Sequence, residues 1–218
     1  MHYLSHNYTE IGNNNPLFSV GLIVPDLAPG FSKTYNQVLK KAPEPADLQL
    51  KQLHKGILAH YEGDRRFHNS PLFTQQVSRT IQSMVQAGLD RQKLRLSVIA
   101  HIAVEMLIDR QIVIQHPDVC NDFYHTIGNA TNHDLIAFFD LHSLEVQKRE
   151  FLSKFQFFKD MRYLYQFSKL ERVVYALDKV YGMVARTEFT KIEKSQFLQG
   201  LGNIDGEIRY NWQEILNA

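Results

Sequence analysis

The stretch SVIAHIAVEMLID, residues 97–109, decides the fold class of this protein. Its apolar residues cover nearly every face of a helix, and such a helix is stable only when other parts of the protein surround it. We therefore predict a central buried helix over about 91–115, which His116-Pro117 ends because a residue before proline disfavours the helical conformation. Three polar side chains interrupt this helix at intervals of four residues: His101, Glu105 and Asp109.

A second polar stripe lies upstream in HYEGDRRFH, residues 60–68. It repeats the spacing of four with His60, Asp64 and His68, so these side chains lie along one slowly turning helix face. Imidazole nitrogen and carboxylate oxygen are ligands of Zn, Mn and Fe, and a pair four residues apart can chelate one ion. We therefore expect the two stripes to face one shared metal site.

Each of these side chains also has a purely structural interpretation. A single histidine on an apolar helix is usually a hydrogen-bonded core residue, and Asp64 or Glu105 could pair with a nearby arginine. Asp109 is the weakest candidate, because we expect it near the exposed end of its helix. The two stripes together favour the metal site, since an ionised carboxylate buried in so apolar a helix needs a compensating partner.

Turn-forming residues cluster before residue 47, and helical patterns dominate after it. Asp47 predicts the start of a helix that runs to His68, and Ser70-Pro71 predicts the start of the next helix, which Gly88 closes. Further helices are expected over about 132–151, 155–166, 170–186, 190–201 and 204–216. The sequence has no alternating strand patterns bounded by turns. It predicts an all-α protein with a single helical domain over 1–218, in which the loop-rich segment 7–46 covers the site.

Composition limits the classes of function. The 218 residues include 24 Lys and Arg and 23 Asp and Glu, so the net charge is close to zero. This charge argues against a nuclease or another protein that binds nucleic acid. The one cysteine, Cys120, can form neither an intramolecular disulfide nor a cysteine-based zinc motif. The first residues lack the features of a secretory signal, and no apolar run approaches the roughly 20 residues of a membrane span. We expect a cytoplasmic protein.

Five short stretches, in the same order, resemble the acyl carrier protein phosphodiesterases, whose helical fold is related to the HD-domain metal phosphohydrolases. They are MHYLSH (1–6), VGLIVPDL (20–27), KGILAHYEGDRRFHNSPLF (55–73), SVIAHIAVEML (97–107) and VYGMVARTEF (180–189). The resemblance places residues of this chain on the family's site: His6, Asp26, His60, Asp64 and Arg186. His68 and His101 stand where the family has aspartates. A site richer in imidazole favours Zn or Fe over Mn or Mg.

The resemblance implies an HD-like bundle that hydrolyses a phosphodiester with a divalent metal (Zn, Fe or Mn). The family's own reaction releases phosphopantetheine from holo acyl carrier protein, so this carrier protein or a small phosphoester is the implied substrate. The expected metal ligands are His60, Asp64, His68, His101, Glu105 and His6. Asp26, which could also be a ligand, and Arg186 are the candidate catalytic residues, and Arg65 and Arg66 are further candidates for holding phosphate.

Two alternatives stay open. The ligand pattern is also similar to that of helical zinc phospholipases C and S1/P1-type nucleases, which suggests a zinc phospholipase-like hydrolase. The chain could instead be a non-catalytic helical binding module that kept the scaffold, because two of the family's aspartates are replaced. An acidic carrier protein needs a basic surface, which the segment 154–172 offers. The favoured interpretation of this segment is an amphipathic helical pair with its aromatic residues in the core.

Overall fold

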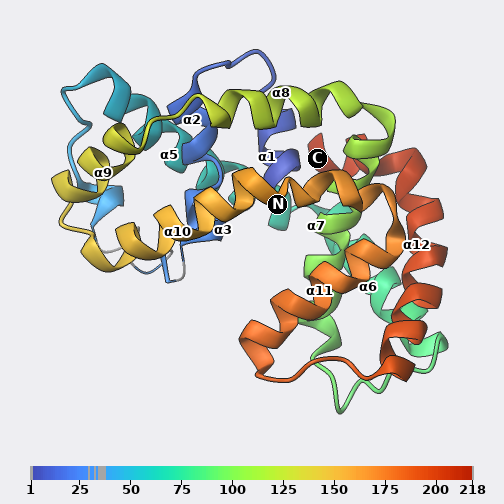
Figure 1. The fold of residues 1–218 in the computed structure, drawn as a ribbon. Coiled ribbons are helices and arrows are strands. Elements are labelled where there is room, and N and C mark those ends of the chain that lie inside the picture. Colours follow the sequence, from blue (N-terminus) through green and yellow to red (C-terminus); the bar gives the residue numbers. More distant parts are fainter. Residues whose placement is uncertain (1, 29, 32, 34–37, 218) are drawn as a thin grey trace. The chain divides into compact units, whose positions relative to one another are not determined.

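The computed structural model describes residues 2–28, 30–31, 33 and 38–217, and their regular elements are all helices (Figure 1). The predicted all-α class is therefore confirmed. Within these residues, no helix combines the length and the hydropathy needed to cross a membrane. The chain forms two compact units: unit 1 comprises Met1–Arg65 and Asp118–Tyr163, and unit 2 comprises Arg66–Pro117 and Leu164–Ala218. The single domain over 1–218 stays a prediction.

Unit 1 begins with several short helices and continues with longer ones. Its elements are α1 (Tyr3–Thr9), α2 (Pro16–Gly21), α3 (Val24–Leu27), η1 (Leu39–Lys41), most of α5 (Leu48–His68), α8 (Pro117–Gly128), α9 (Asn132–Leu141) and α10 (Glu145–Met161). The segment 7–46, expected to be rich in loops, thus contains α2, α3 and η1. Asn15 starts α2, because its side-chain oxygen accepts hydrogen bonds from the N–H groups of Leu17 and Phe18.

Two glycines let α2 and α5 approach each other closely. A Cβ atom on Gly21 would lie 2.8 Å from the Cα atom of Gly56, and it would overlap the carbonyl oxygen of Leu53. A Cβ atom on Gly56 would overlap the carbonyl oxygen of Phe18 in the same way. Only glycine fits at either position. This approach brings the C-terminal end of α2 to the part of α5 that carries His60.

The predicted start of α5 is confirmed, whereas the predicted helix over 132–151 is interrupted. The Asp47 side chain accepts hydrogen bonds from the N–H groups of Gln49 and Leu50 at 2.8 and 3.0 Å. Farther along, α9 ends at Leu141 and α10 begins at Glu145. Ser143, between them, has φ 56°, a left-handed conformation that cannot continue a helix.

Three aromatic residues of the segment 154–172, Phe155, Phe158 and Phe167, belong to the core as the favoured interpretation predicts, whereas Phe157 is 62% exposed. Phe155 and Phe158 are buried on α10, and Phe155 stacks on Phe151 with ring centroids 5.3 Å apart. The predicted helix over 155–166 is divided: its first part belongs to α10, which ends at Met161, and residues 163–166 belong to η2 (Tyr163–Ser168). Lys159 lies over the Phe155 ring, 4.6 Å from its centroid, which is a cation–π contact.

Unit 2 is built around the predicted central helix. Its elements are the last residues of α5, α6 (Pro71–Gln86), α7 (Leu96–Gln115), η2 (Tyr163–Ser168), α11 (Leu170–Ala185) and α12 (Lys191–Asn217). The expected boundaries of α6 are confirmed, because Ser70 accepts a hydrogen bond from the N–H group of Phe73 and Gly88 has φ 94°.

The central helix α7 starts five residues later than predicted. The side chain of Asp90 accepts hydrogen bonds from the N–H groups of Gln92 and Lys93, and this turn excludes residues 91–95 from the helix. The end at Gln115 is as predicted, but Pro117 opens a new helix, α8, that the sequence analysis missed. Proline favours the first helical position because its missing N–H is not needed there.

Arg110 joins α7 to α12 and to η2 within unit 2. Its Nε atom donates to both carboxylate oxygens of Asp205, at 3.0 and 3.1 Å. Its Nη1 atom donates to the carbonyl oxygens of Phe167, at 2.7 Å, and of Ser168. Arg110, a possible partner of Glu105 in the structural interpretation of the sequence, thus makes its described contacts with other groups.

The two helices expected over 190–201 and 204–216 form one continuous helix, α12. Thr190 and Glu193 start it as a capping box, in which each side chain accepts a hydrogen bond from the other's N–H group. Gly200 does not end the helix but lets α6 approach it: a Cβ atom there would lie 3.1 Å from the Cα atom of Met84.

Candidate metal centre

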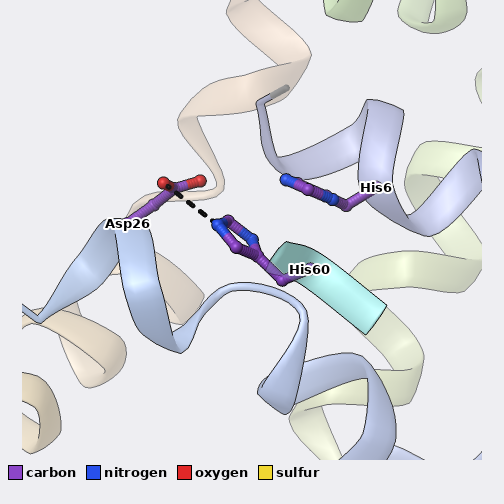
Figure 2. Close-up of side chains that lie close together, drawn as sticks. All are labelled: His6, Asp26 and His60. Atoms are coloured by element: carbon purple, nitrogen blue, oxygen red, sulfur yellow. Dashed lines mark ion pairs between the residues drawn. The ribbon is translucent and has the colours of Figure 1, made fainter. Parts of the chain in front are cut away.

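Four of the predicted site residues lie together in unit 1. His6 on α1, Asp26 on α3 and His60 on α5 each offer one ligand atom, and these three atoms lie within 4.8 Å of one another (Figure 2). Asp64 lies one turn after His60, and its two oxygens are 3.2 Å from Nε2 of His6 and 3.4 Å from Nε2 of His60. We call His6, Asp26, His60 and Asp64 the unit 1 cluster.

A backbone carbonyl fixes the orientation of His60. Its Nδ1 atom lies 2.7 Å from the carbonyl oxygen of Leu22, and since a carbonyl can only accept, Nδ1 carries the proton of this hydrogen bond. In the neutral ring, Nε2 then holds the lone pair, and it faces Asp64 and, at 3.9 Å, Asp26. This arrangement is typical of metal-binding histidines, whose other ring nitrogen donates to a carbonyl or a carboxylate.

His6 places a polar atom in the interior, and no residue that the structure describes forms a hydrogen bond with it. Its side chain is only 1% exposed, and its ring stacks on that of His60 with centroids 4.0 Å apart. The buried Nε2 atom faces the carboxylate of Asp64, but the contact lacks the geometry of a hydrogen bond. Such an unsatisfied buried atom costs about 1–3 kcal/mol, and a bound cation would satisfy it.

Burial and mutual contact set the charges of the unit 1 cluster. Burial and the nearby His60 lower the pKa of His6 to about 3, so its imidazole is neutral at neutral pH. Burial opposes a charge on His60, but Asp26 and Asp64 raise its pKa above the ordinary value. Burial also opposes ionisation of Asp64, yet contacts from both histidines hold its pKa below the usual range. Burial raises the pKa of Asp26.

The donors of the unit 1 cluster fit a divalent transition metal. Two imidazoles and two carboxylates are a ligand set suited to Zn, Fe or Mn, and neutral imidazole and ionised carboxylate are the forms that bind metal. The histidines are buried, whereas the side chains of Asp26 and Asp64 are 30% and 25% exposed. Solvent can therefore reach the cluster from the side of its carboxylates.

The remaining predicted ligands form a second group, which lies in unit 2. His68 is the last residue of α5, and His101 and Glu105 lie one turn apart on α7. The Oε1 atom of Glu105 is 2.8 Å from Nε2 of His68 and 3.2 Å from Nε2 of His101. The two stripes, expected to share one site, thus contribute donors to two groups. We call His68, His101 and Glu105 the unit 2 cluster.

Asp109 and the arginines take other places in the structure. Asp109 is fully buried, so the expectation that it lies at an exposed helix end was wrong: α7 has buried residues as far as Val113. Arg65 is paired with Glu62 at 2.7 Å. Arg186 is exposed at the C-cap of α11, with φ 55°, and its catalytic role stays a prediction.

One contributor to the unit 1 cluster was missed: the carbonyl group of Leu22, which orients His60. The pattern of side chains in a sequence does not predict which backbone carbonyl group a distant side chain will contact. The available signal was Gly56, one helical turn before His60, because a glycine inside a helix costs stability unless another backbone must come close. Comparison of the chain with protein-family models, with curated proteins and with solved structures gave no match.

Proposed function

We propose that the protein is a metal-dependent phosphoesterase and that its reaction takes place at the unit 1 cluster. One observation carries the proposal: Nε2 of His6 is buried with no hydrogen-bond partner among the described residues, and it faces a carboxylate at 3.2 Å. A structural histidine in the core would normally have a hydrogen-bond partner, whereas a metal ligand needs a free lone pair. The fixed tautomer of His60 supports the same assignment.

Each residue of the unit 1 cluster has a role in this proposal. His6, His60 and Asp64 hold the ion, which when bound would supply the Lewis acidity that activates water and polarises a phosphoryl oxygen. Asp26 is more exposed than the histidines, so water can reach its carboxylate, and partial burial raises its pKa. We assign it the role of general base, which accepts the proton of the attacking water on its carboxylate.

The substrate class rests on the resemblance to the acyl carrier protein phosphodiesterases. Of the five residues that this resemblance places on the family's site, four form the unit 1 cluster, namely His6, Asp26, His60 and Asp64, and the fifth, Arg186, belongs to unit 2. That agreement supports a phosphodiester as substrate, and phosphopantetheine on an acyl carrier protein is the first candidate. An HD-like arrangement of the helices belongs to the same proposal.

Metal analysis combined with a generic phosphodiester assay tests the proposal. We expect the purified protein to hold stoichiometric Zn, Fe or Mn and to hydrolyse bis(p-nitrophenyl) phosphate. Asp26→Asn should lower kcat by about 100-fold or more, the usual contribution of a general base. Asp122→Asn is the matched control, because Asp122 is an exposed carboxylate on α8 in the same unit.

The outcomes separate the candidate functions. Release of phosphopantetheine from holo acyl carrier protein, abolished in His60→Ala, would support the specific substrate. A protein that takes up no metal after incubation with each ion would refute the proposal. Bound metal without turnover of any phosphoester would favour the non-catalytic binding module.

A further inference from the structure

We infer that unit 2 has a metal site of its own, in which the unit 2 cluster binds an ion independently of the unit 1 cluster. The inference goes beyond the proposed function, which involves unit 1 alone. Its basis is the convergence of three ligand atoms: Nε2 of His68, Nε2 of His101 and Oε1 of Glu105. Their separations are 2.8 Å for His68–Glu105, 3.2 Å for His101–Glu105 and 3.2 Å for His101–His68.

These separations fit a single ion. Donors about 2.0–2.1 Å from a tetrahedral zinc ion lie about 3.2–3.4 Å from one another, close to two of the three distances. An ion at such a distance from all three atoms would lie about 1 Å outside their plane. The three donors would then occupy one side of the ion, and the opposite side would remain open to water or another ligand.

A simple hydrogen-bonded arrangement explains the unit 2 cluster less well. Glu105 needs only one imidazole to compensate its carboxylate, yet two imidazoles approach the same oxygen atom. The two imidazole Nε2 atoms also lie 3.2 Å from each other. Since each Nε2 atom carries at most one proton, the two rings cannot both donate to Glu105 and also hydrogen-bond to each other. A cation between the three atoms attracts all of them, and neutral imidazoles with an ionised carboxylate are the forms that bind it.

Packing holds the imidazole rings in place before an ion arrives. The Phe73 ring lies 5.4 Å from the His68 ring and 4.9 Å, edge to face, from the His101 ring. Phe67, which is buried, packs on Phe73 at 4.4 Å. Metal sites bind tightly when neighbouring side chains fix the ligands in this way.

Exposure and donor type indicate which ion binds. The side chains of His68 and His101 are 32% and 39% exposed, so an ion can enter and exchange. Two imidazoles and one carboxylate favour Zn or Fe(II) over Mg or Ca, which prefer sites made of oxygen. The site therefore takes Zn or Fe(II) with at least one exchangeable ligand position.

Zinc stoichiometry tests independence. Equilibrium dialysis of the chelator-treated protein against Zn²⁺ should give two ions per chain for the wild type and one for His101→Ala or Glu105→Gln. His60→Ala should also bind one ion, through the unit 2 cluster. His125→Ala, which removes an exposed histidine outside both clusters, should still bind two. Circular dichroism checks that each variant is folded.

Three results would overturn the inference. One is a stoichiometry of two zinc ions per chain in His101→Ala as well as in the wild type. Another is a stoichiometry of one zinc ion per chain in both the wild type and His101→Ala, because the ion would then be bound at the unit 1 site. The third is a wild type with a single ion that both His60→Ala and His101→Ala lose, which would mean one shared site. In contrast, a single ion lost only in His101→Ala would support this inference and refute the proposed function at unit 1.

Discussion

The Nδ1 atom of His60 donates a hydrogen bond to the carbonyl oxygen of Leu22, 2.7 Å away. Leu22 is the C-cap residue of α2, where carbonyl groups have no partner within the helix. The contact therefore satisfies a helix end and fixes the ring of a candidate metal ligand at the same time. It depends on the close approach of α2 and α5 at Gly21 and Gly56.

Gly56→Ala should destabilise unit 1 and weaken its metal binding. The added Cβ atom would overlap the carbonyl oxygen of Phe18, so α2 has to move, and Leu22 moves with it. Overpacking of this kind costs about 1–3 kcal/mol or more. Urea denaturation and zinc affinity measure the two effects. Gly206→Ala is the control: Gly206 has open space around it within α12, and alanine should raise stability by up to about 1 kcal/mol.

His6→Phe should change stability in opposite directions with and without metal. Phenylalanine keeps the stacked ring but removes the buried nitrogen that has no hydrogen bond. In the presence of chelator, the variant should be at least as stable as the wild type, by up to about 1–3 kcal/mol. With excess Zn²⁺ the wild type should be the more stable, because an ion that binds only the folded state stabilises it. Thermal melts with EDTA and with Zn²⁺ measure both; a loss of stability in EDTA would count against an unsatisfied His6.

Arg110→Met should cost about 3 kcal/mol or more. The substitution removes the cationic partner of Asp205, whose carboxylate keeps the hydrogen bond from Gln111, and the donor to the carbonyl oxygen of Phe167, in a mostly buried place. The matched variant is Arg79→Met. Arg79 and its partner Glu207 are both about half exposed. Exposed pairs of that kind contribute less than about 1 kcal/mol. Equal losses in the two variants, measured by chemical denaturation, would contradict the role of Arg110 as a link between helices.

Stability should fall as the pH drops below about 6.5, partly because of His54 and His142. Burial lowers the pKa of both histidines from the ordinary 6.5. Nδ1 of His54 and Nε2 of His142 are buried, and neither has a hydrogen-bond partner in the part of the chain that the structure describes. Above pH 6.5 both are neutral whether the chain is folded or not. Below pH 6.5 these histidines bind protons in the unfolded chain but not in the folded chain. The free energy of unfolding therefore decreases as the pH falls toward the lowered pKa values of the folded protein.

Replacing His54 tests this contribution to the pH dependence. In His54→Phe, the loss of stability between pH 7.5 and pH 5.5, measured by urea denaturation, should be smaller than in the wild type. His125→Ala should lose as much as the wild type, because His125 is exposed. An unchanged pH dependence in His54→Phe would show that His54 takes up its proton in the folded protein.

The residues that make local contacts were predictable, and those that depend on distant contacts were not. Asp47 and Ser70 act as helix caps as their sequence context predicts, because a cap binds N–H groups two or three residues away. The division between α9 and α10 was missed, because it follows from a left-handed Ser143 that no local pattern marks. The join of 190–201 to 204–216 was missed because α12 continues through Gly202, a residue type that local patterns associate with helix ends.

The same distinction applies to the candidate site. Helical spacing predicted that His60 and Asp64 lie together, and likewise His101 and Glu105, because each pair is one turn apart. Spacing within a helix says nothing about which donors of other helices join them. The division of the expected single site into two clusters therefore became visible only in the structure.

The division of the chain into units has a consequence for its synthesis. Each unit is made of two separate segments, so unit 1 lacks part of its chain until the ribosome has passed Tyr163. The donors of each cluster, however, lie within one uninterrupted segment: residues 6–64 for unit 1 and 68–105 for unit 2. A nascent chain thus exposes all ligands of the first cluster before it has made any of the second. An ion captured at that stage would hold α1, α3 and α5 together while α8, α9 and α10 are still being translated.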